Sequence, residues 1–409
     1  MKKLRVLIAG AGVTGEAVAF WLSRGGHDVV VAERFPELRA YGAQVDLRGQ
    51  GIEAAQAMGL LDRIEERLVD EPGVAFVDRN GRRRGTIMAN TSGTGRQTLT
   101  SEYEIMRGDL VQVLHEANGE GVDHRFGVGV EGFDQDEHAV TVRFSDGSAE
   151  DFDLLVGADG QGSRLRRAVV TDDHDPYRHL GIHLAYWFVP RIASDGRIRD
   201  TYLAPRGRQI MRRSHNATET QAYFVQRDSS PDFAAIHRRP VAEQQAFWAE
   251  RFRDAGWQAQ RFIDGMPDSP FFYSQEVVQV RLDRWSRGRV VLAGDAAHCA
   301  SPYSGMGISG GLVGAYVLAG QLNRGADDLP TALANYETEL RPFVDEIQGT
   351  VKPRLLNLAL PTKQAGIEVL LGVAGLATAL RIPELAARFA REDRGGAWRL
   401  PPRPAPVLR

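Results

Sequence analysis

The glycine-rich turn near the N-terminus constrains the fold more than any other feature of the sequence. Residues 4–9 are apolar and rich in β-branched side chains, as in a buried parallel strand, and residues 15–24 are largely apolar, as in a packed helix. The turn between them reads Gly10-Ala11-Gly12-Val13-Thr14-Gly15. In such a unit the first glycine permits the tight turn, the second lets a pyrophosphate approach the backbone, and the third lets the helix pack closely on the strand. The pattern therefore predicts an α/β fold with a dinucleotide at the start of the helix.

An acidic residue ends the second predicted strand, which covers residues 29–32. Glu33 stands where a carboxylate can accept hydrogen bonds from the 2′- and 3′-hydroxyls of a ribose. FAD or NAD is therefore favoured over NADP at this site. We expect Glu33 and the next residue, Arg34, to lie against the dinucleotide.

The bulk composition excludes several classes of protein. The formal net charge is −3, so no strong field attracts nucleic acid or an anionic membrane. The single cysteine, Cys299, can form neither a disulfide within the chain nor a cysteine-rich metal site, which fits a reducing cytoplasm. The first apolar run is too short for a signal peptide, and the apolar segment 367–380 is too short to span a bilayer. We therefore expect a cytoplasmic protein with no membrane association.

The pattern changes in the middle of the chain. A hairpin is predicted at residues 74–88, and from about residue 183 to 280 short strand-like runs surround one predicted helix, residues 241–253. Residues 289–293 return to a core strand, and mostly helical sequence follows to about residue 390. These changes indicate a sheet module inserted into the nucleotide-binding domain, with a Pro- and Arg-rich tail that we expect to be disordered.

Two later segments add carboxylates and glycines at predicted strand ends. One runs from Asp153 to Arg164, and the other from Gly294 to Gly307. In order and spacing, these segments and the opening turn resemble the class A flavoprotein monooxygenases, the single-component FAD hydroxylases typified by para-hydroxybenzoate hydroxylase. The resemblance covers about residues 1–350. The short members that act on polycyclic or polyketide-like substrates, including the tetracycline-inactivating monooxygenases, look most similar.

The resemblance implies a Rossmann-like FAD-binding domain with an inserted β-sheet substrate domain and a C-terminal helical region. The expected division is an FAD-binding domain, first part, at 1–175 with a substrate-side hairpin near 74–105; a substrate-binding sheet domain at 176–280; the second part of the FAD-binding domain at 281–350; C-terminal helices at 351–395; and a tail at 396–409.

The resemblance also implies the chemistry. NADPH or NADH docks transiently and reduces FAD, and the reduced flavin adds O2 as a C4a-hydroperoxide that hydroxylates an aromatic or polyketide-like small molecule. A second glycine fingerprint followed by an acid is missing, so we expect no dedicated NAD(P)H domain. Because the cofactor carries this chemistry, no side chain is assigned as catalytic and no metal ion is expected.

Residues that match the family motifs are expected at FAD. Asp295 is expected on the ribityl hydroxyls, and the helix after Gly307 is expected to point its N-terminus at the flavin pyrimidine. A helix cap remains an alternative for Asp159 and Asp295, and a surface position remains one for Arg48 and Arg107. The full set is Gly10, Gly12, Val13, Thr14, Gly15, Glu33, Arg34, Arg48, Arg107, Asp159, Gly160, Arg164, Gly294, Asp295, Pro302, Gly305, Met306, Gly307 and Ile308.

Two positions depart from the family pattern. Ser309 stands where many members have Asn, and Gly314 where they have Asp, so part of the flavin contact must come from the main chain. We expect His298 to be structural rather than a proton shuttle, and Cys299 to be a small buried filler.

The substrate is expected between the flavin and the inserted sheet. An aromatic wall and a pair of cations are candidates to line it, although core positions and an exposed strand pair are open alternatives for the same residues. The candidates are Trp187, Phe188, Arg212, Arg213, Phe224 and Tyr303.

Other activities of the same fold remain open. Flavin-dependent halogenases need a Trp-x-Trp-x-Ile-Pro run, which residues 186–190 lack. Baeyer–Villiger oxygen insertion by the same flavin peroxide is an alternative to hydroxylation, and a non-catalytic FAD-containing ligand-binding protein is a further one. The sequence is compatible with a monomer or a homodimer.

Overall fold

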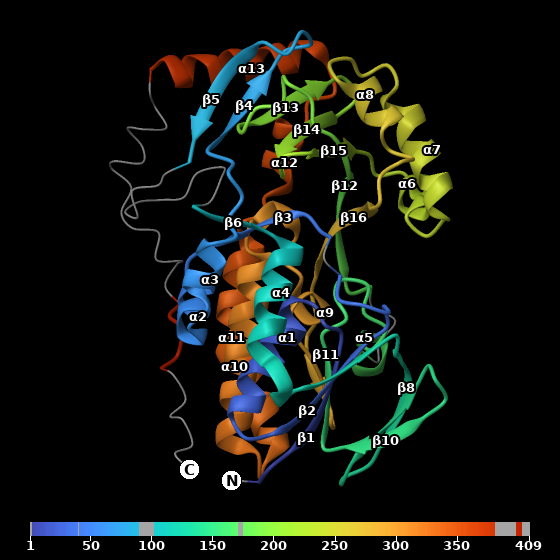
Figure 1. The fold of residues 1–409 in the computed structure, drawn as a ribbon, viewed down its shortest axis with the longest axis vertical. Coiled ribbons are helices and arrows are strands. Elements are labelled where there is room, and N and C mark those ends of the chain that lie inside the picture. The colour runs from blue at the N-terminus through green and yellow to red at the C-terminus, as the bar shows by residue number, and fades with distance from the viewer. Residues whose placement is uncertain (1, 40, 90–101, 171–174, 381–397, 403–409) are drawn as a thin grey trace.

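The computed structural model describes residues 2–39, 41–89, 102–170, 175–380 and 398–402. Figure 1 shows two parts along the long axis: a lower part that combines a sheet with long helices, and an upper part built around a larger sheet. Within these described ranges, no helix is both long and apolar enough to cross a lipid bilayer.

A mostly parallel sheet with strand order β17-β18-β11-β1-β2-β7 forms the centre of the lower part. Only β17 runs antiparallel to its neighbour. The inner strands of this sheet are almost continuously buried and apolar, as expected for a parallel sheet covered on both faces. The expected α/β class is confirmed. The strands are β1 (Arg5–Ala9), β2 (Asp28–Glu33), β7 (Asp123–Phe126), β11 (Leu154–Gly157), β17 (Ser286–Arg287) and β18 (Val290–Leu292).

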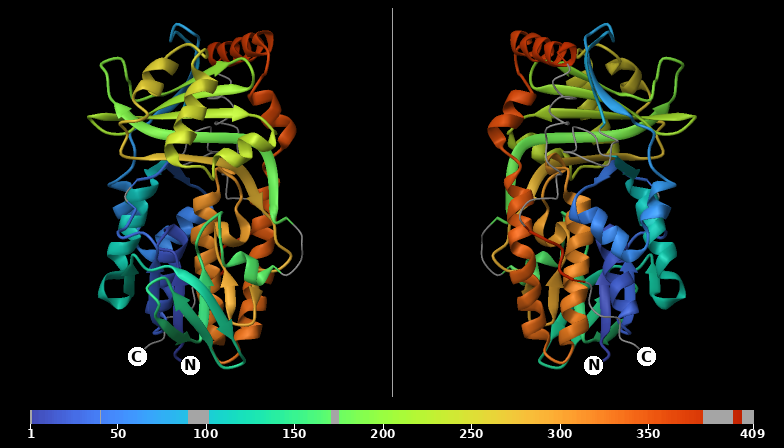
Figure 2. Two further views of the ribbon diagram at one scale, coloured as in Figure 1. Left: turned by 90° about the vertical axis from the view of Figure 1, so that its right-hand side faces the viewer. Right: turned by 90° about the vertical axis from the view of Figure 1, so that its left-hand side faces the viewer.

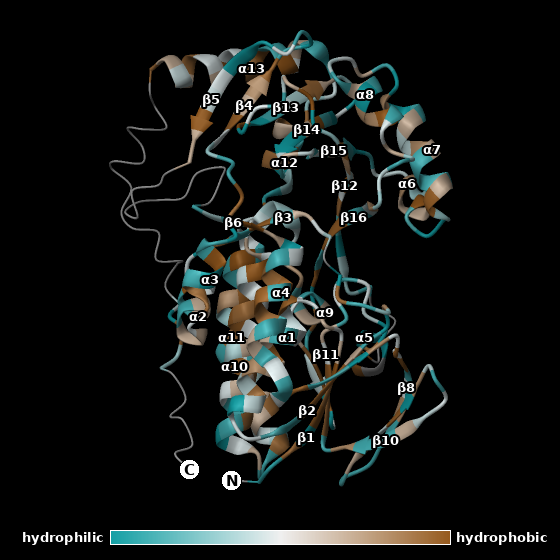
Figure 3. Ribbon diagram, viewed as in Figure 1, coloured by the Kyte–Doolittle hydropathy of each residue, from teal (hydrophilic) through white to brown (hydrophobic). Residues whose placement is uncertain are grey.

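Helices and a small antiparallel sheet share one hydrophobic core with the parallel sheet. Helix α10 packs between α1 and α11, and Figure 3 shows hydrophobic residues along these central helices. The long helices are α1 (Val13–Arg24), α4 (Arg107–Asn118), α10 (Gly307–Gly325) and α11 (Leu329–Gly349). The small sheet contains β8 (Val130–Gln135), β9 (Val140–Phe144) and β10 (Ala149–Phe152). Shorter elements are α2 (Gln50–Met58), α3 (Leu61–Glu65), α5 (Arg166–Val169), α9 (Asp295–His298), η1 (Gly119–Gly121) and η2 (Pro302–Ser304).

The upper part contains a seven-stranded sheet with order β16-β12-β15-β14-β13-β4-β5. Its strands run across the long axis of the molecule, whereas the long helices below run along it (Figure 2). The predicted hairpin joins this sheet at one edge, because β4 pairs in parallel with β13. The strands are β4 (Gly73–Val77), β5 (Arg83–Met88), β12 (Tyr177–Pro190), β13 (Arg199–Ala204), β14 (Arg208–Ser214), β15 (Glu219–Arg227) and β16 (Phe272–Val280).

The two faces of the large sheet bury different clusters. The outer face packs against α6, α7 and α8, and the inner face packs against α12, α13 and η2. A short ribbon of β3 and β6 lies between the two parts (Figure 1). The bounds are α6 (Pro231–Ile236), α7 (Val241–Phe252), α8 (Ala259–Asp264), α12 (Pro353–Ala359), α13 (Gln364–Ala379), β3 (Gln44–Leu47) and β6 (Tyr103–Met106).

The tail differs in part from the expectation of disorder. Trp398 stacks on Phe343 with ring centroids 5.0 Å apart and donates its indole N–H to the carbonyl of Glu339 at 2.9 Å. Residues 398–402 therefore pack on the helices, and the expectation was wrong for this segment. The expected helical sequence beyond residue 380 and the rest of the tail lie outside the described residues.

Candidate active site

In the glycine turn, packing of the fold requires glycine at two positions and does not require it at a third. Gly10 has φ +110°, and a Cβ there would lie 2.7 Å from the carbonyl oxygen of Ala158. A Cβ on Gly15 would lie 1.9 Å from the carbonyl oxygen of Gly10. A Cβ on Gly12 would meet only Arg107 Nη2 at 3.5 Å, an ordinary contact. Packing therefore explains two of the glycines, and an approaching ligand is the reason that remains for the third.

The start of α1 offers free donors beside this turn. No side chain caps the helix, so its first N–H groups and the positive end of its dipole are available to an anion. Glu33 ends β2 next to them: its Oε2 accepts the Ala11 N–H at 2.9 Å, and its Oε1 accepts the Phe35 N–H at 3.1 Å. These bonds hold the carboxylate at the turn. Arg34 is exposed, with its guanidinium 5.1 Å from the Phe35 ring centroid.

The second motif closes a turn and is held by an arginine that sequence reasoning missed. Asp159 Oδ2 accepts the Arg164 N–H at 2.8 Å, and the Arg164 side chain is exposed. Arg166 is buried, and its guanidinium donates to the carbonyls of Gln161 at 2.6 Å and Ala296 at 2.8 Å. Arg166 therefore joins the second motif to the third. The only signal in the sequence was a second arginine two positions after Arg164.

The third motif meets the first through Thr14. Gly294 has φ +60°, and a Cβ there would lie 2.3 Å from Thr14 Oγ1. The next side chain, Asp295, is exposed, yet protein surrounds it closely. Burial raises the pKa of this carboxyl group, against the lowering effects of a hydrogen bond with Cys299 and the charge of Arg107. Its exposed carboxylate, next to the contact between the first and third motifs, is placed to accept a hydrogen bond from a ligand hydroxyl.

The start of α10 is also uncapped and has space beside it, like the start of α1. Gly305 has φ +64° and ends η2, no side chain caps α10, and a Cβ on Gly307 would meet no atom within 4 Å. Arg48 lies beside this turn, since a Cβ on Gly305 would be 3.4 Å from its Nε, and its Nη2 binds Asp46 Oδ2 at 2.8 Å. The flanking residues Pro302, Met306 and Ile308 are exposed or half-buried.

The two departures from the family pattern have packing roles. Ser309 is fully buried, and its hydroxyl accepts the backbone N–H of Arg48 at 2.9 Å. A Cβ on Gly314 would lie 3.3 Å from His298 Nε2, so glycine makes room for that ring. His298 packs 5.0 Å from the centroid of Trp285, and burial lowers its pKa to about 4. A buried neutral imidazole fits the structural role expected for it. Burial likewise raises the thiol pKa of Cys299 and keeps it protonated.

Trp187 and Phe224 are corrections to the expected substrate wall. Both are fully buried on the outer face of the large sheet. Trp187 donates its indole N–H to the carbonyl of Phe262 at 3.0 Å, and Phe224 stacks on Phe252 with centroids 4.1 Å apart. Successive strand residues point to opposite faces, and the sequence alone did not say which face α6–α8 would cover.

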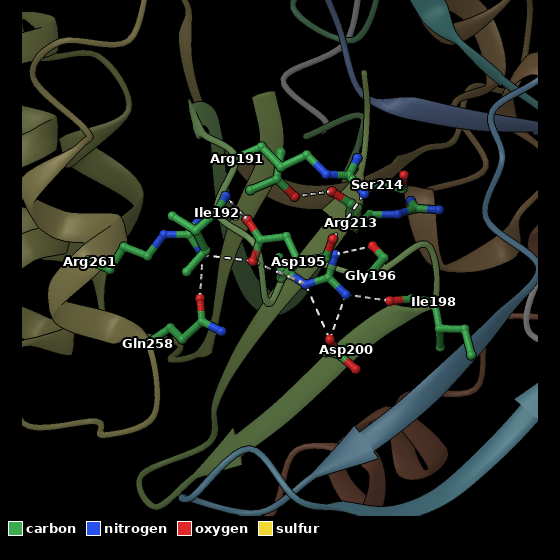
Figure 4. Close-up of polar contacts among 12 residues, drawn as sticks. Arg191, Ile192, Asp195, Gly196, Ile198, Asp200, Arg213, Ser214, Gln258 and Arg261 are labelled. Carbon is green, nitrogen blue, oxygen red and sulfur yellow. Dashed lines mark hydrogen bonds and ion pairs between the residues drawn. The ribbon is translucent and has the colours of Figure 1, made fainter. Parts of the chain in front are cut away.

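Arg212 and Arg213 are also corrections, for different reasons. Arg212 lies on the outer face and is held by Asp200, by Asp195 and by the carbonyls of Gly196 and Ile198; Figure 4 labels these partners. Arg213 lies on the inner face, but it is buried in ion pairs with Glu71 at 2.7 Å and with Glu104. Their own chain neutralises both guanidinium groups, which leaves neither available to an anionic ligand.

A row of tyrosines lies on the inner face of the large sheet, the side on which we expected the substrate-lining residues. Tyr273, Tyr186 and Tyr223 lie directly opposite one another on β16, β12 and β15, with ring centroids 5.4 and 5.1 Å apart. We call these three residues the tyrosine row. Burial raises the pKa of all three phenols, to about 12 for Tyr223, so they stay neutral hydroxyls. Sequence reasoning did not single out these three tyrosines, because they stand in separate strands and only the pairing of the strands brings them together.

The tyrosine row faces the flavin motifs. Its cluster includes Tyr303 of η2, and Phe188 lies on the same face of β12 with its ring 5.9 Å from that of Tyr41. Arg39 and Arg107 both lie near enough to lower the pKa of Tyr186. Within the described part of the chain, the Arg107 guanidinium makes no hydrogen bond or ion pair. A cation without a partner therefore stands between the glycine turn and the row.

These residues fit a bound FAD. The open positions at Gly12 and Gly307, the uncapped starts of α1 and α10, and the Glu33 and Asp295 carboxylates supply the backbone donors and hydroxyl acceptors that this dinucleotide requires.

Comparison with known proteins agrees with this geometry. A family model described as an FAD binding domain matches residues 3–349. The chain belongs to this FAD-binding family, and by class it is an FAD-dependent monooxygenase. An FAD-dependent monooxygenase of Sarocladium schorii is 35% identical over 428 aligned positions that cover 99% of each chain. The solved tetracycline destructases Tet(55) and Tet(51) superpose with TM-scores of 0.79 and 0.77 at 27% and 30% identity, covering 98% and 96% of this chain and 98% and 100% of theirs.

Proposed function

We propose that this enzyme uses NAD(P)H and O2 to hydroxylate an aromatic or polyketide-like small molecule, by the flavin chemistry that the resemblance implies. The observation that carries the proposal is the tyrosine row on the sheet face that is turned toward the flavin motifs. Neutral phenols on a mostly apolar wall bind the face of a flat aromatic substrate. Tyr223 and Tyr273 donate their hydroxyl protons to Gln221 and Gln275 at 2.8 Å, so the Tyr186 hydroxyl is the one proposed to donate to a substrate oxygen.

In this proposal the chain's main task is to bind and orient FAD. The start of α1 would hold the pyrophosphate, Glu33 the adenosine ribose and Asp295 the ribityl hydroxyls. The start of α10 would face the flavin ring, and its dipole would stabilise the negative charge of the reduced ring. Bound FAD would supply the electron transfer and oxygen activation that no side chain of the chain can provide.

The substrate would lie between the flavin and the tyrosine row. Arg39 and Arg107 would place positive charge at its edge, because both approach Tyr186. Such an arrangement favours a substrate with phenol, enol or carbonyl oxygens over a purely apolar one. The tetracycline destructases, which share the fold, support a polycyclic substrate class.

A substrate screen with the yellow holoenzyme tests the proposal. We expect phenolic polycycles to accelerate NADPH or NADH oxidation and to gain one oxygen atom by product mass, and product structure separates hydroxylation from Baeyer–Villiger insertion. Tyr186→Phe should raise KM for the best substrate about tenfold, the loss of one hydrogen bond. Tyr202→Phe is the matched control, because that tyrosine lies on the outer face and donates to the carbonyl of Ala255. A colourless purified protein, or equal effects of the two variants, would contradict the proposal.

A further inference from the structure

A buried carboxylate behind the glycine turn binds two histidines that the flavin site does not use. Glu16 lies in the first turn of α1 with no exposed surface. Its Oε1 lies 3.3 Å from His115 Nδ1, and its Oε2 lies 3.0 Å from His124 Nε2. His115 belongs to α4 and His124 to β7, so the three side chains come from three separate elements. Their ligand atoms all lie within 4.8 Å of one another.

The ligand types of this cluster suit a cation. The Glu16 carboxyl group lies inside the protein without an arginine or lysine partner among the described residues, and its side-chain contacts are with His115, His124 and Asn118. Carboxylate and imidazole together are typical zinc ligands.

The distances agree with a tetrahedral ion. Zinc binds imidazole nitrogen and carboxylate oxygen at about 2.0–2.1 Å, which places neighbouring ligand atoms of a tetrahedron about 3.3 Å apart. The two Glu16–histidine distances, 3.3 and 3.0 Å, are of that size, and they end on different carboxylate oxygens, so the carboxylate must turn for one oxygen to meet both nitrogens. The two imidazole rings lie with their centroids 4.3 Å apart.

A candidate fourth group and an entry path are also present. Asn118 is 6% exposed, and its Oδ1 has no hydrogen-bond partner, while its Nδ2 donates to Glu16 Oε2 at 2.6 Å and to the Glu16 carbonyl at 3.1 Å. Rotation of the amide would exchange these two bonds for an Oδ1 turned toward the ion. The His115 side chain is 31% exposed, which leaves solvent access for an ion or a bound water.

We propose that Glu16, His115 and His124 form a zinc-binding site that clamps α1, α4 and β7 together. Both helices begin at the flavin motifs, α1 beside Gly12 and α4 at Arg107. Zinc would thereby fix α1 by its first turn and α4 by its last turn, and α4 would carry this restraint along its length to Arg107. By linkage, zinc binding and FAD binding strengthen each other.

Zinc titration of metal-stripped holoenzyme tests the site. We expect one Zn²⁺ per chain by calorimetry and metal analysis, no comparable binding of Mg²⁺, and FAD dissociation at least about fivefold slower with zinc present. Glu16→Gln and His124→Gln should each weaken zinc binding by more than about 100-fold. His179→Gln is the matched control, because His179 contacts two carboxylates, Asp175 and Glu276, outside the cluster, and this variant should bind zinc like the wild type.

His115→Gln controls for misfolding, because this residue is partly exposed and its substitution leaves no cavity in the core. Its FAD content and melting temperature in the absence of zinc should equal those of the wild type, while its zinc affinity falls. Holoenzyme that binds no stoichiometric zinc, or that binds it equally well in all cluster variants, would show that Glu16 and its neighbours are a hydrogen-bonded packing unit only.

Discussion

The flavin-motif region and the large sheet would hold their proposed ligands in different ways, and this difference determines how much of each site the sequence predicts. In the flavin-motif region the proposed contacts are mostly backbone: the glycines at residues 12 and 307 and the uncapped starts of α1 and α10. In the sheet the proposed contacts are side chains, and each strand carries two sets that point in opposite directions. Tyr186 and Trp187 are neighbours in the chain, yet one faces the flavin motifs and the other the core beneath α6–α8.

A contact made by the main chain restricts which residue type can stand there. A contact made by a side chain restricts only which face of the sheet that residue must lie on. A close backbone approach admits little besides glycine, so a short motif marks it. Either face of the sheet can carry aromatic residues, and the outer face holds Trp187, Phe224 and Trp248 in a dry cluster. Aromatic content therefore does not identify the substrate side. In the proposal, the tyrosine row marks the inner face as the substrate side, and the pairing of three separate strands assembles that row.

The largest expected effect comes from the glycine turn. Gly15→Ala would place a Cβ 1.9 Å from the Gly10 carbonyl oxygen, so we expect no FAD after purification and a lowered melting temperature. Gly12→Ala meets no such clash, so the apoprotein should fold normally while its FAD affinity falls sharply. Flavin absorbance and thermal melting with and without added FAD separate the two results. Gly162→Ala, whose Cβ meets no atom within 4 Å, should keep full FAD content. Wild-type FAD affinity in Gly12→Ala would show that no dinucleotide approaches the backbone at residue 12.

The same contrast explains how far sequence reasoning reached. The α/β class, the order of the motifs and the start of α10 followed from glycines and strand ends, which are local features. Which face of the large sheet packs against α6–α8 depends on contacts between residues that are far apart in the chain. Arg213 illustrates this limit, because its partners Glu71 and Glu104 come from elements more than a hundred positions away. Arg166 was missed because only its burial distinguishes it from Arg164.

The outer face should respond to mutation through stability. Trp187→Ala removes a fully buried ring, and we expect a loss of about 3–5 kcal/mol in the free energy of unfolding, measured by denaturant titration. Trp187→Phe keeps most of the volume and should leave the KM of the best substrate unchanged while lowering the melting temperature. A raised KM with an unchanged melting temperature would contradict the core position and indicate that Trp187 contacts the substrate.

A smaller effect is expected from the ion cluster where the sheet meets β6. Burial raises the pKa of Glu104 from 4.5 to about 7, opposed by Arg213 and reinforced by Glu71. Between those pH values the native state holds a proton that the unfolded state has released, so this group's contribution to stability falls as pH rises. Relative to the wild type, Glu104→Gln should therefore gain about 1–3 kcal/mol between pH 4.5 and pH 7 and change no further above that range. Denaturant unfolding at several pH values measures the difference, and a constant difference across the range would contradict the raised pKa.

The smallest effect tests a side chain inside the flavin-motif region itself. Ser309→Ala leaves the partly buried Arg48 N–H without its acceptor, which costs about 1 kcal/mol of unfolding free energy. Because the hydroxyl serves this backbone bond, the flavin absorption spectrum and the FAD affinity should remain those of the wild type. A shifted flavin spectrum in Ser309→Ala would mean that this side chain, like those of the sheet, touches the ligand directly. The division between backbone contacts in one region and side-chain contacts in the other would then fail at the start of α10.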